Sequence, residues 1–313
     1  MTTEELKRFE IPGRVTIFDG NGELPKIEVT TDTSTAEIYL HGAHVADFKK
    51  RGEPSLLFTS QCSRFEAGQP IRGGVPIIFP WFGPREGSAA HGFARAANWI
   101  LQETASIPNG GVSLRFGFPG STENALWPAF SAYYVVTVTD TLSLELIITN
   151  TSPEQELTFE NCLHTYFTIG DINAVSVRGL KDVTYLDKVG GFTQKTEQND
   201  AIRVTGEVDR VYLNTTSAVE ILDPSLGRKI VVEKSGSAST VVWNPWIAKS
   251  QQMSDFGNDE YLRMICVESG NVATNKLTLA PGKSSVLKVV LSSSRLRAEP
   301  VTFATAQCEP SRR

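Results

Sequence analysis

Apolar and polar residues alternate with a period of two along most of this chain. The alternating segments are rich in valine, isoleucine, threonine, tyrosine and phenylalanine, a composition typical of half-buried β-strands. They are TAEIYLHGAHVADFK (35–49), VSLRFGF (112–118), AYYVVTVTDTLSLELIITN (132–150), SAVEILD (217–223), KIVVEKS (229–235) and SVLKVVLSS (285–293). The pattern therefore predicts a protein built mainly of strands.

The longest alternating segment is interrupted by three polar residues at 139–141. Two alternating runs joined by a short polar stretch predict a β-hairpin, here between Tyr133 and Thr149. Successive antiparallel pairing is the simplest topology for the remaining strands. A chain of this length then most readily stacks two large sheets, so we expect an all-β fold, a large antiparallel β-sandwich.

Helical signals are few: EELKRFE near the N-terminus, and a stretch that opens at Ser254 or Asp255. No glycine- and serine-rich linker, charge block or short repeat divides the chain. We therefore expect a single domain over residues 25–295, with terminal extensions at 1–24 and 296–313.

Composition narrows the classes of function. Of the 313 residues 40% are hydrophobic and 21% are charged, enough to bury a core without disulfides or metals. The formal net charge of -5 argues against a broad nucleic-acid surface, so any anion site must be local. The N-terminus lacks an apolar secretory segment, and VPIIFPWF is too short to span a bilayer. We expect a monomer without nucleic-acid or membrane partners.

Four cysteines, at positions 62, 162, 266 and 308, are scattered along the chain without a CxxC pair. This spacing fits neither a zinc site nor a disulfide framework. We expect reduced thiols and a cytoplasmic protein.

The segment LTFENCLHTYF contains the first candidate for proton chemistry. On a regular strand, Glu160, Cys162, His164 and Tyr166 share one face, because side chains alternate between faces. An imidazole exchanges protons near neutral pH, which suits His164 to general acid catalysis. A histidine with only a structural role is the alternative.

A carboxylate in RMICVESGN is the second candidate. Met264, Cys266 and Glu268 would share a strand face, just before a predicted Ser-Gly-Asn turn. Burial of that face would raise the pKa of Glu268 and make it a better base. The alternative is a glutamate at a strand end, hydrogen-bonded to the turn amides.

The segment 70–95 is rich in glycine, proline and aromatic residues, which indicates a long ordered loop over a site. Arg72 precedes two glycines, so the backbone could approach a ligand closely while the guanidinium grips an anion. Arg95 could supply a second guanidinium group to bind the same anion. Both arginines could instead pair with loop carboxylates such as Glu66 or Glu86.

Other polar residues have two readings each. His91 could contact a ligand or occupy a turn, whereas we assign His41 and His44 no role. Asp209 could bind a sugar hydroxyl or form only a surface ion pair with Arg210. Aromatic residues that could lie under a sugar ring, or pack in the core, are Trp81, Phe82, Trp243 and Trp246.

Six motifs, taken together, resemble the aldose 1-epimerase superfamily, and specifically its hexose-6-phosphate branch. They are RGGVPIIFPWFGP (72–84), HGFAR (91–95), FENCLHTYF (159–167), DRVY (209–212), VVWNPW (241–246) and CVESGNV (266–272). The resemblance spans about residues 30–290. It implies a galactose-mutarotase-like β-supersandwich, which agrees with the strand pattern. It also implies interconversion of the α and β anomers of a hexose 6-phosphate, D-glucose 6-phosphate above all, without cofactor or metal.

The resemblance further implies roles for six residues. His164 corresponds to the general acid and Glu268 to the general base. The substrate ligands would be Arg72 and Arg95 for the 6-phosphate, His91 for the ring and anomeric oxygens, and Asp209 for a hydroxyl. One departure is Ala90, where some relatives have glutamine, so a hydrogen bond made there would be missing.

Two other functions stay open. An aldose 1-epimerase for unphosphorylated hexoses would use the two arginines only structurally. A non-catalytic carbohydrate-binding module would keep the groove, but it would not need a proton-transfer pair.

Overall fold

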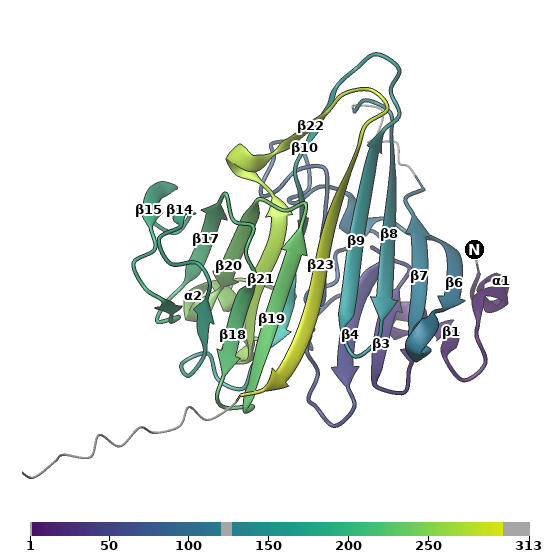
Figure 1. Cartoon of the computed structure of the whole chain (residues 1–313), viewed down its shortest axis with the longest axis horizontal. Coiled ribbons are helices and arrows are strands. Elements are labelled where there is room, and N and C mark those ends of the chain that lie inside the picture. Colours follow the sequence, from purple (N-terminus) through teal and green to yellow (C-terminus); the bar gives the residue numbers. More distant parts are fainter. Residues whose placement is uncertain (1, 120–126, 297–313) are drawn as a thin grey trace, which may run out of the picture.

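A nine-stranded antiparallel sheet spans the width of the computed structural model, which describes residues 2–119 and 127–296 (Figure 1). In spatial order its strands are β16 (Ala201–Ile202), β13 (Ser176–Arg178), β18 (Val219–Asp223), β19 (Arg228–Ser235), β23 (Ser284–Arg295), β9 (Leu142–Asn150), β8 (Phe130–Val138), β7 (Val112–Gly117) and β6 (Ile100–Ser106). The predicted hairpin is confirmed, because β8 and β9 pair in continuous register around residues 139–141.

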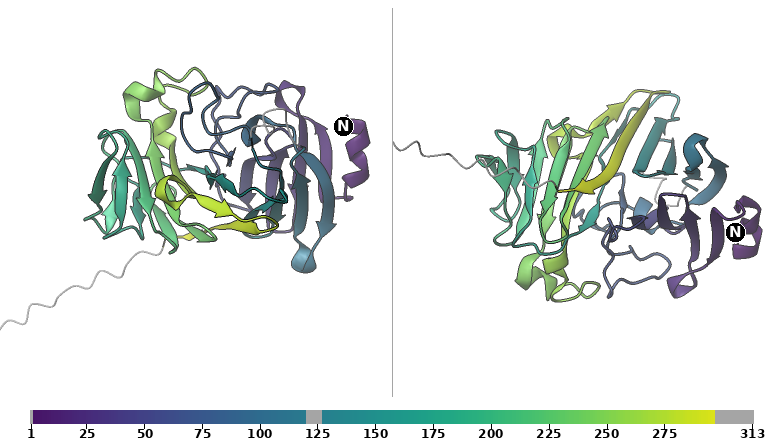
Figure 2. Two further views of the ribbon diagram at one scale, coloured as in Figure 1. Left: turned by 90° about the horizontal axis from the view of Figure 1, so that it is seen from above. Right: turned by 60° about the horizontal axis from the view of Figure 1, so that its bottom comes forward.

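Two further sheets face the nine-stranded sheet (Figure 2). The eight-stranded sheet contains β15 (Thr193–Thr196), β14 (Thr184–Asp187), β17 (Val208–Leu213), β20 (Ser239–Asn244), β21 (Met264–Asn271), β11 (Asn161–Leu163), β5 (Ile77–Ile78) and β12 (Tyr166–Thr168). The four-stranded sheet contains β1 (Val15–Asp19), β2 (Pro25–Thr30), β3 (Ser34–Tyr39) and β4 (His44–Lys50). A single hydrophobic cluster includes Val29, Leu144 and Tyr212, one residue from each of the three sheets. The predicted all-β sandwich is confirmed.

Burial along the strands follows the alternation of the sequence. In β9 every second side chain is buried, as expected for a sheet with one face on the core and one on solvent. In β21 all eight residues are buried instead. Polar residues on β21 are therefore desolvated wherever they point, which includes Glu268.

The remaining elements are short. A two-stranded sheet joins β10 (Leu157–Phe159) to β22 (Leu277–Leu279). The helical turns are α1 (Thr3–Leu6), η1 (Lys7–Phe9), η2 (Asn21–Glu23), η3 (Ala94–Ala96), η4 (Pro108–Gly110), α2 (Trp246–Ser250), η6 (Glu260–Arg263) and η7 (Ala273–Asn275). Among the described residues, no helix is long and apolar enough to cross a membrane.

The N-terminal helix was expected, and the stretch that opens at Ser254 or Asp255 supplies one helical turn, η6, a few residues later. Helical turns lie on either side of that point, in α2 and η6. At the start of α2, the side-chain oxygen of Asn244 accepts the backbone N–H of Trp246 at 2.9 Å. The carboxylate of Asp255 is instead held by Arg72.

The N-terminal segment takes part in the fold. Strand β1 pairs with β2 over five residues, and Leu6 is completely buried in the core cluster. Ordered structure thus begins well before residue 25. Of the expected C-terminal extension, residues 297–313 lie outside the described residues, and Cys308 lies there with them.

Tyr134 on β8 offers a test of core energetics. Its side chain is completely buried, and its hydroxyl has no hydrogen-bond partner among the described residues. We expect Tyr134→Phe to raise the free energy of unfolding by about 1 kcal/mol, because it removes an unpaired buried polar group. Urea denaturation measures this.

The matched control is Tyr212→Phe, because the Tyr212 hydroxyl donates to Glu197 at 2.9 Å. That variant should lose stability. A loss of stability in Tyr134→Phe as well would contradict the assignment of an unpaired hydroxyl.

Candidate functional site

A buried histidine and a buried glutamate are in direct contact at the centre of the eight-stranded sheet. The Nε2 atom of His164 lies 3.2 Å from Oε1 of Glu268, and the two residues are only 8% and 1% exposed. The thiol of Cys162 donates to the other carboxylate oxygen at 3.6 Å. Strands β11 and β21 pair side by side, which brings the two segments together from distant parts of the sequence.

The strand that carries His164 is not regular. It breaks between β11 and β12, where the backbone N–H of His164 donates to the Pro76 carbonyl at 3.0 Å. Glu160 is not among the residues that line the cleft with His164, and its carboxylate accepts the backbone N–H groups of Phe82 and Ala273.

The structure also decides between the two readings of Glu268. The predicted Ser-Gly-Asn turn is absent, because β21 continues through residue 271. Glu268 therefore lies inside a buried strand, and Met264 and Cys266 share its face as the alternation predicts. The alternative of a strand-end glutamate bonded to turn amides is wrong.

Burial sets the electrostatics of this pair. It raises the pKa of Glu268 well above its usual value, and the Asp209 carboxylate acts in the same direction. Burial also lowers the pKa of His164 well below its usual value, and the positive charges of Arg95 and Arg72 add to the effect. Both shifts therefore disfavour the charged forms of the two residues.

The pair opens into a cleft of about 330 Å³. All six residues predicted for the site line it: Arg72, His91, Arg95, His164, Asp209 and Glu268. The cleft also contains the aromatic rings of Phe82 and Trp243, two of the four predicted platform residues. Trp81 instead stacks on Trp127, outside the cleft, and Trp246 packs against Tyr261.

Arg72 is firmly held in the cleft wall. Its guanidinium forms an ion pair with Asp255 at 3.0 Å and donates to the Tyr166 hydroxyl at 3.0 Å. Burial alone would lower the pKa of Arg72, but these two contacts raise it above its usual value. The sequence alternative of a pair with Glu66 or Glu86 is therefore wrong for Arg72.

The two glycines after Arg72 serve packing rather than ligand approach. A Cβ atom on Gly73 would lie 2.4 Å from the Phe58 carbonyl oxygen, and one on Gly74 would lie 2.2 Å from the Val45 carbonyl oxygen. Close contact between the loop and neighbouring backbone requires glycine at both positions. The loop thereby fixes where the Arg72 side chain begins.

Arg95 differs from Arg72 in its hydrogen-bond partner. Its Nη2 donates to the Ala90 carbonyl at 2.7 Å, and among the described residues no carboxylate pairs with it. Burial lowers the pKa of Arg95 to about 10, and the charge of Arg72 acts in the same direction. Two guanidinium groups thus line one small cleft, and among the described residues only that of Arg72 forms an ion pair.

His91 enters the cleft from a strained turn. Its φ is 66°, and the following Gly92 packs so tightly that a Cβ atom would lie 2.0 Å from the Phe79 carbonyl oxygen. The Gly83 N–H donates to Nδ1 of His91 at 3.3 Å. Burial lowers the pKa of His91 to about 3, aided by the charge of Arg95, so its imidazole is neutral at physiological pH.

Asp209 on β17 also reaches the cleft. It forms an ion pair with Lys188 at 3.0 Å, whereas Arg210 pairs with Glu197. The alternative of a surface pair between Asp209 and Arg210 is therefore wrong. Neighbours on a strand point to opposite faces, which separates their side chains.

The described geometry can be compared with known proteins. A family model described as aldose 1-epimerase matches residues 25–292. The chain belongs to the aldose 1-epimerase family. The predicted family resemblance is thereby confirmed, and the antiparallel sandwich described above is the fold in which this family member holds its cleft.

Relatives of this aldose 1-epimerase family member extend over most of its length. A protein of Escherichia coli (strain K12) is 37% identical over 263 residues, which are 82% of this chain and 86% of the relative. A protein of Cenchrus ciliaris is 35% identical over 284 residues, 88% of this chain and 84% of the relative. Both bear the name "Putative glucose-6-phosphate 1-epimerase".

Solved structures share the fold. The crystal structure of a "putative mutarotase" from Salmonella typhimurium has a TM-score of 0.84 and 32% identity, covering 91% of this chain and 95% of its own. A galactose mutarotase-like protein from Clostridium acetobutylicum has a TM-score of 0.71 at 15% identity, covering 90% of this chain and 98% of its own. The second likeness extends to the fold alone.

Sequence reasoning missed three charged residues of this family member's site. Lys188 and Lys249 line the cleft, and Asp255 holds Arg72. Lys188 follows the short strand β14, and Asp255 lies in a turn after α2, so neither belongs to a quoted motif. The tertiary fold brings these residues to the site from the end of β14, from α2 and from the turn after α2.

The donor atoms near the acid–base pair could also suit a metal. One nitrogen, one sulfur and one oxygen atom, from His164, Cys266 and Glu268, lie within 4.8 Å of one another. Such a mixed set fits a thiophilic cation. The chemistry argued below uses no metal, and the expected absence of one stays a prediction.

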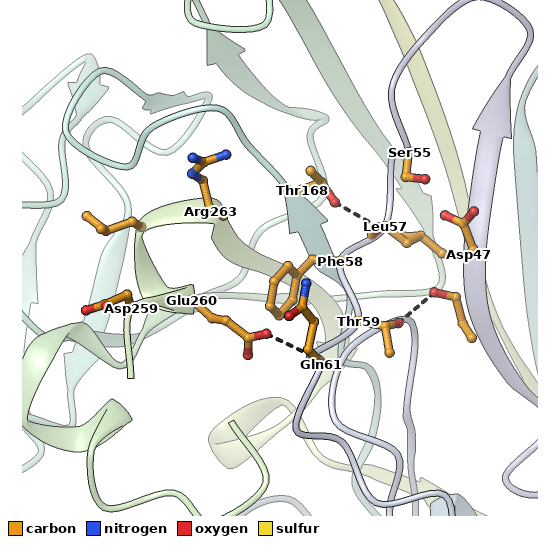
Figure 3. Close-up of a pocket in the computed structure, with 12 residues that line it drawn as sticks. Asp47, Ser55, Leu57, Phe58, Thr59, Gln61, Thr168, Asp259, Glu260 and Arg263 are labelled. Carbon is orange, nitrogen blue, oxygen red and sulfur yellow. Dashed lines mark hydrogen bonds between the residues drawn. The ribbon is translucent and has the colours of Figure 1, made fainter. Parts of the chain in front are cut away.

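A larger cavity of about 700 Å³ lies beside η6 (Figure 3). Its polar groups are bonded within the protein: Thr168 donates to the Leu57 carbonyl at 2.8 Å, and Glu260 accepts the Gln61 N–H at 2.8 Å. Its described lining contains no histidine. The smaller cleft is therefore the better candidate for chemistry.

Proposed function

We propose that this protein interconverts the α and β anomers of a hexose 6-phosphate, with D-glucose 6-phosphate as the first candidate. The observation that carries the proposal is Arg95, a partly buried guanidinium that has no carboxylate partner among the described residues, in the same cleft as the His164 and Glu268 pair. A buried charge is costly unless it is paired, so this cleft favours an anionic ligand. The names of the relatives point to the same substrate class.

The phosphate would bind to Arg72 and Arg95. Guanidinium groups match phosphate oxygens with two parallel hydrogen bonds, which fixes orientation as well as position. The phosphate is remote from C1 of the sugar, so its binding energy serves to orient the ring against the acid–base pair.

The acid–base pair would carry the reaction. Interconversion requires opening of the hemiacetal, rotation about the C1–C2 bond and reclosure on the opposite face. Glu268 would take the O1 proton while His164 gives a proton to the ring oxygen, and reclosure reverses both transfers. The reaction is redox-neutral, so it requires no redox cofactor. Each positioned proton transfer typically contributes a factor of about 10²–10⁴ in rate.

The substrate would also adjust the protonation of the pair. Before binding, the opposite pKa shifts favour the proton on Glu268 rather than on His164. A phosphate bound at Arg72 and Arg95 offsets the positive charge that helps to lower the pKa of His164. Binding would therefore shift the pKa of His164 upward, the direction that the proposed mechanism needs.

His91 and Asp209 would hold the sugar. Because Nδ1 of the neutral His91 accepts a hydrogen bond, its Nε2 carries the hydrogen and can donate to a ring or anomeric oxygen. The carboxylate of Asp209 would accept a sugar hydroxyl while its pairing with Lys188 fixes it.

Anomerisation of freshly dissolved α-D-glucose 6-phosphate tests the proposal directly. Polarimetry or fast proton NMR should record much faster equilibration with the protein than without it, and slower catalysis on free glucose. Equal rates on the phosphorylated and free sugar would favour an aldose 1-epimerase for unphosphorylated hexoses. Rates equal to the blank on glucose 6-phosphate, glucose and galactose would refute catalysis and favour a carbohydrate-binding module.

We also propose that the protein acts in the cytoplasm, as a monomer, on a small-molecule hexose phosphate. The thiols of Cys62, Cys162 and Cys266 are free, which suits a reducing compartment. Sedimentation velocity would test the monomer, and a dimer peak at micromolar concentration would contradict it.

A further inference from the structure

The guanidinium of Arg72 is already fixed on two sides. Its Nε and Nη2 donate to Oδ2 of Asp255 at 3.2 and 3.0 Å, and its Nη1 donates to the Tyr166 hydroxyl at 3.0 Å. A guanidinium has five N–H hydrogens, so these bonds leave two for a ligand. Two N–H groups suffice for one bidentate contact with a phosphate.

Tyr166 contacts both the anion-binding and the proton-transfer parts of the site. Besides accepting from Arg72, its ring lies almost parallel to the His164 imidazole, with 4.8 Å between centroids and 14° between planes. Burial raises the pKa of Tyr166, so the phenol stays neutral at physiological pH.

The backbone of Tyr166 is held on both sides. Its N–H donates to the Gly74 carbonyl at 2.9 Å, and its own carbonyl accepts the Phe58 N–H at 3.0 Å. The residue is only 1% exposed. Because its backbone is held and its side chain is buried, the ring of Tyr166 has a fixed position relative to the groups that it contacts.

We propose that Tyr166 is a positioning residue that holds the Arg72 fork and the His164 imidazole at a fixed spacing, matched to the phosphate and ring oxygen of one sugar. The phosphate and the ring oxygen are joined by covalent bonds, so their separation varies only within narrow limits. The two protein groups must match that separation, because a misplacement of about 1 Å costs about a hundredfold in rate. The inference rests on the proposed function, since it concerns the same substrate.

Tyr166→Phe tests the inference because it keeps the ring and removes only the hydroxyl. We expect KM for glucose 6-phosphate and Kd for inorganic phosphate each to rise about tenfold, the effect of losing one hydrogen bond to a charged group. The kcat value should change less than threefold, since the stacked ring still supports His164. Tyr166→Leu removes the ring as well, so it should lower kcat in addition to raising KM.

A double-mutant cycle separates positioning from general damage. In an Arg72→Ala background the hydroxyl has lost its partner, so Tyr166→Phe should not raise KM further. Additive effects would overturn the inference. Tyr134→Phe is the matched control, because it removes a buried hydroxyl from β8, away from the cleft.

The outcomes separate this inference from the proposed function. If the wild type binds inorganic phosphate but does not anomerise glucose 6-phosphate, the proposed reaction fails, and weaker phosphate binding by Tyr166→Phe still supports the contact with Arg72. If the wild type is active and Tyr166→Phe keeps both KM and the phosphate Kd, the positioning role is overturned. Should Tyr166→Phe not fold, Tyr166→Leu gives the same decision, since it lacks the hydroxyl too.

Discussion

Replacing Glu268 with glutamine should lower kcat on glucose 6-phosphate by about 10²–10⁴, the usual contribution of a positioned proton-transfer group. Glutamine has nearly the same shape but cannot accept the O1 proton. The buried carboxyl contacts His164 at 3.2 Å and accepts from Cys162, so an amide can occupy its place in the strand. Proton NMR of anomer exchange measures the rate directly.

Two controls accompany this variant. The Kd for inorganic phosphate should stay within about twofold of the wild-type value, because the substitution leaves Arg72 and Arg95 unchanged. Glu145→Gln, on β9 of the other layer, exchanges a carboxylate that pairs with Lys288 and should leave kcat unchanged. A Glu268→Gln variant as fast as the wild type would remove Glu268 from the mechanism.

Replacing Arg95 with alanine should raise KM for glucose 6-phosphate by about 10–100-fold, because a hydrogen bond to a charged group contributes about 1.5–3 kcal/mol. Activity on free glucose should fall by less than about threefold, since that substrate has no phosphate to bind. Removal of this partly desolvated charge, which has no ion-pair partner among the described residues, should also increase stability, as thermal unfolding would record.

The control for this selectivity is Arg263→Ala, which removes an arginine from the larger cavity instead. This variant should keep the wild-type activity on both substrates. Equal losses on glucose 6-phosphate and glucose in Arg95→Ala would contradict phosphate recognition by this residue. A loss of activity in Arg263→Ala but not in Arg95→Ala would place the substrate site in the larger cavity.

The sequence predicted the sandwich and the chemistry-bearing residues through local patterns. Alternation in segments such as 132–150 is enough to specify a half-buried hairpin, because side-chain direction repeats every two residues. The motifs around His164 and Glu268 likewise contain the acid–base candidates within a few adjacent residues. Features that depend only on neighbouring residues, such as alternation and short motifs, can be predicted without knowledge of the fold.

Tertiary structure decided which groups became partners. Arg72 meets Asp255 across 183 positions of sequence, and Lys188 rather than Arg210 meets Asp209. Strand pairing and irregular turns determine such contacts, and no local periodicity encodes them. Glu160 similarly accepts the backbone N–H groups of Phe82 and Ala273, which lie far away in the sequence.

The electrostatics depended on tertiary structure most of all. A glutamate and a histidine become an acid–base pair only when both are desolvated in contact, which shifts their pKa values in opposite directions. The sequence by itself determined the sheets and the residue types available for catalysis. The packing of distant strands determined their distances, burial and charge, because these depend on every layer that surrounds the cleft.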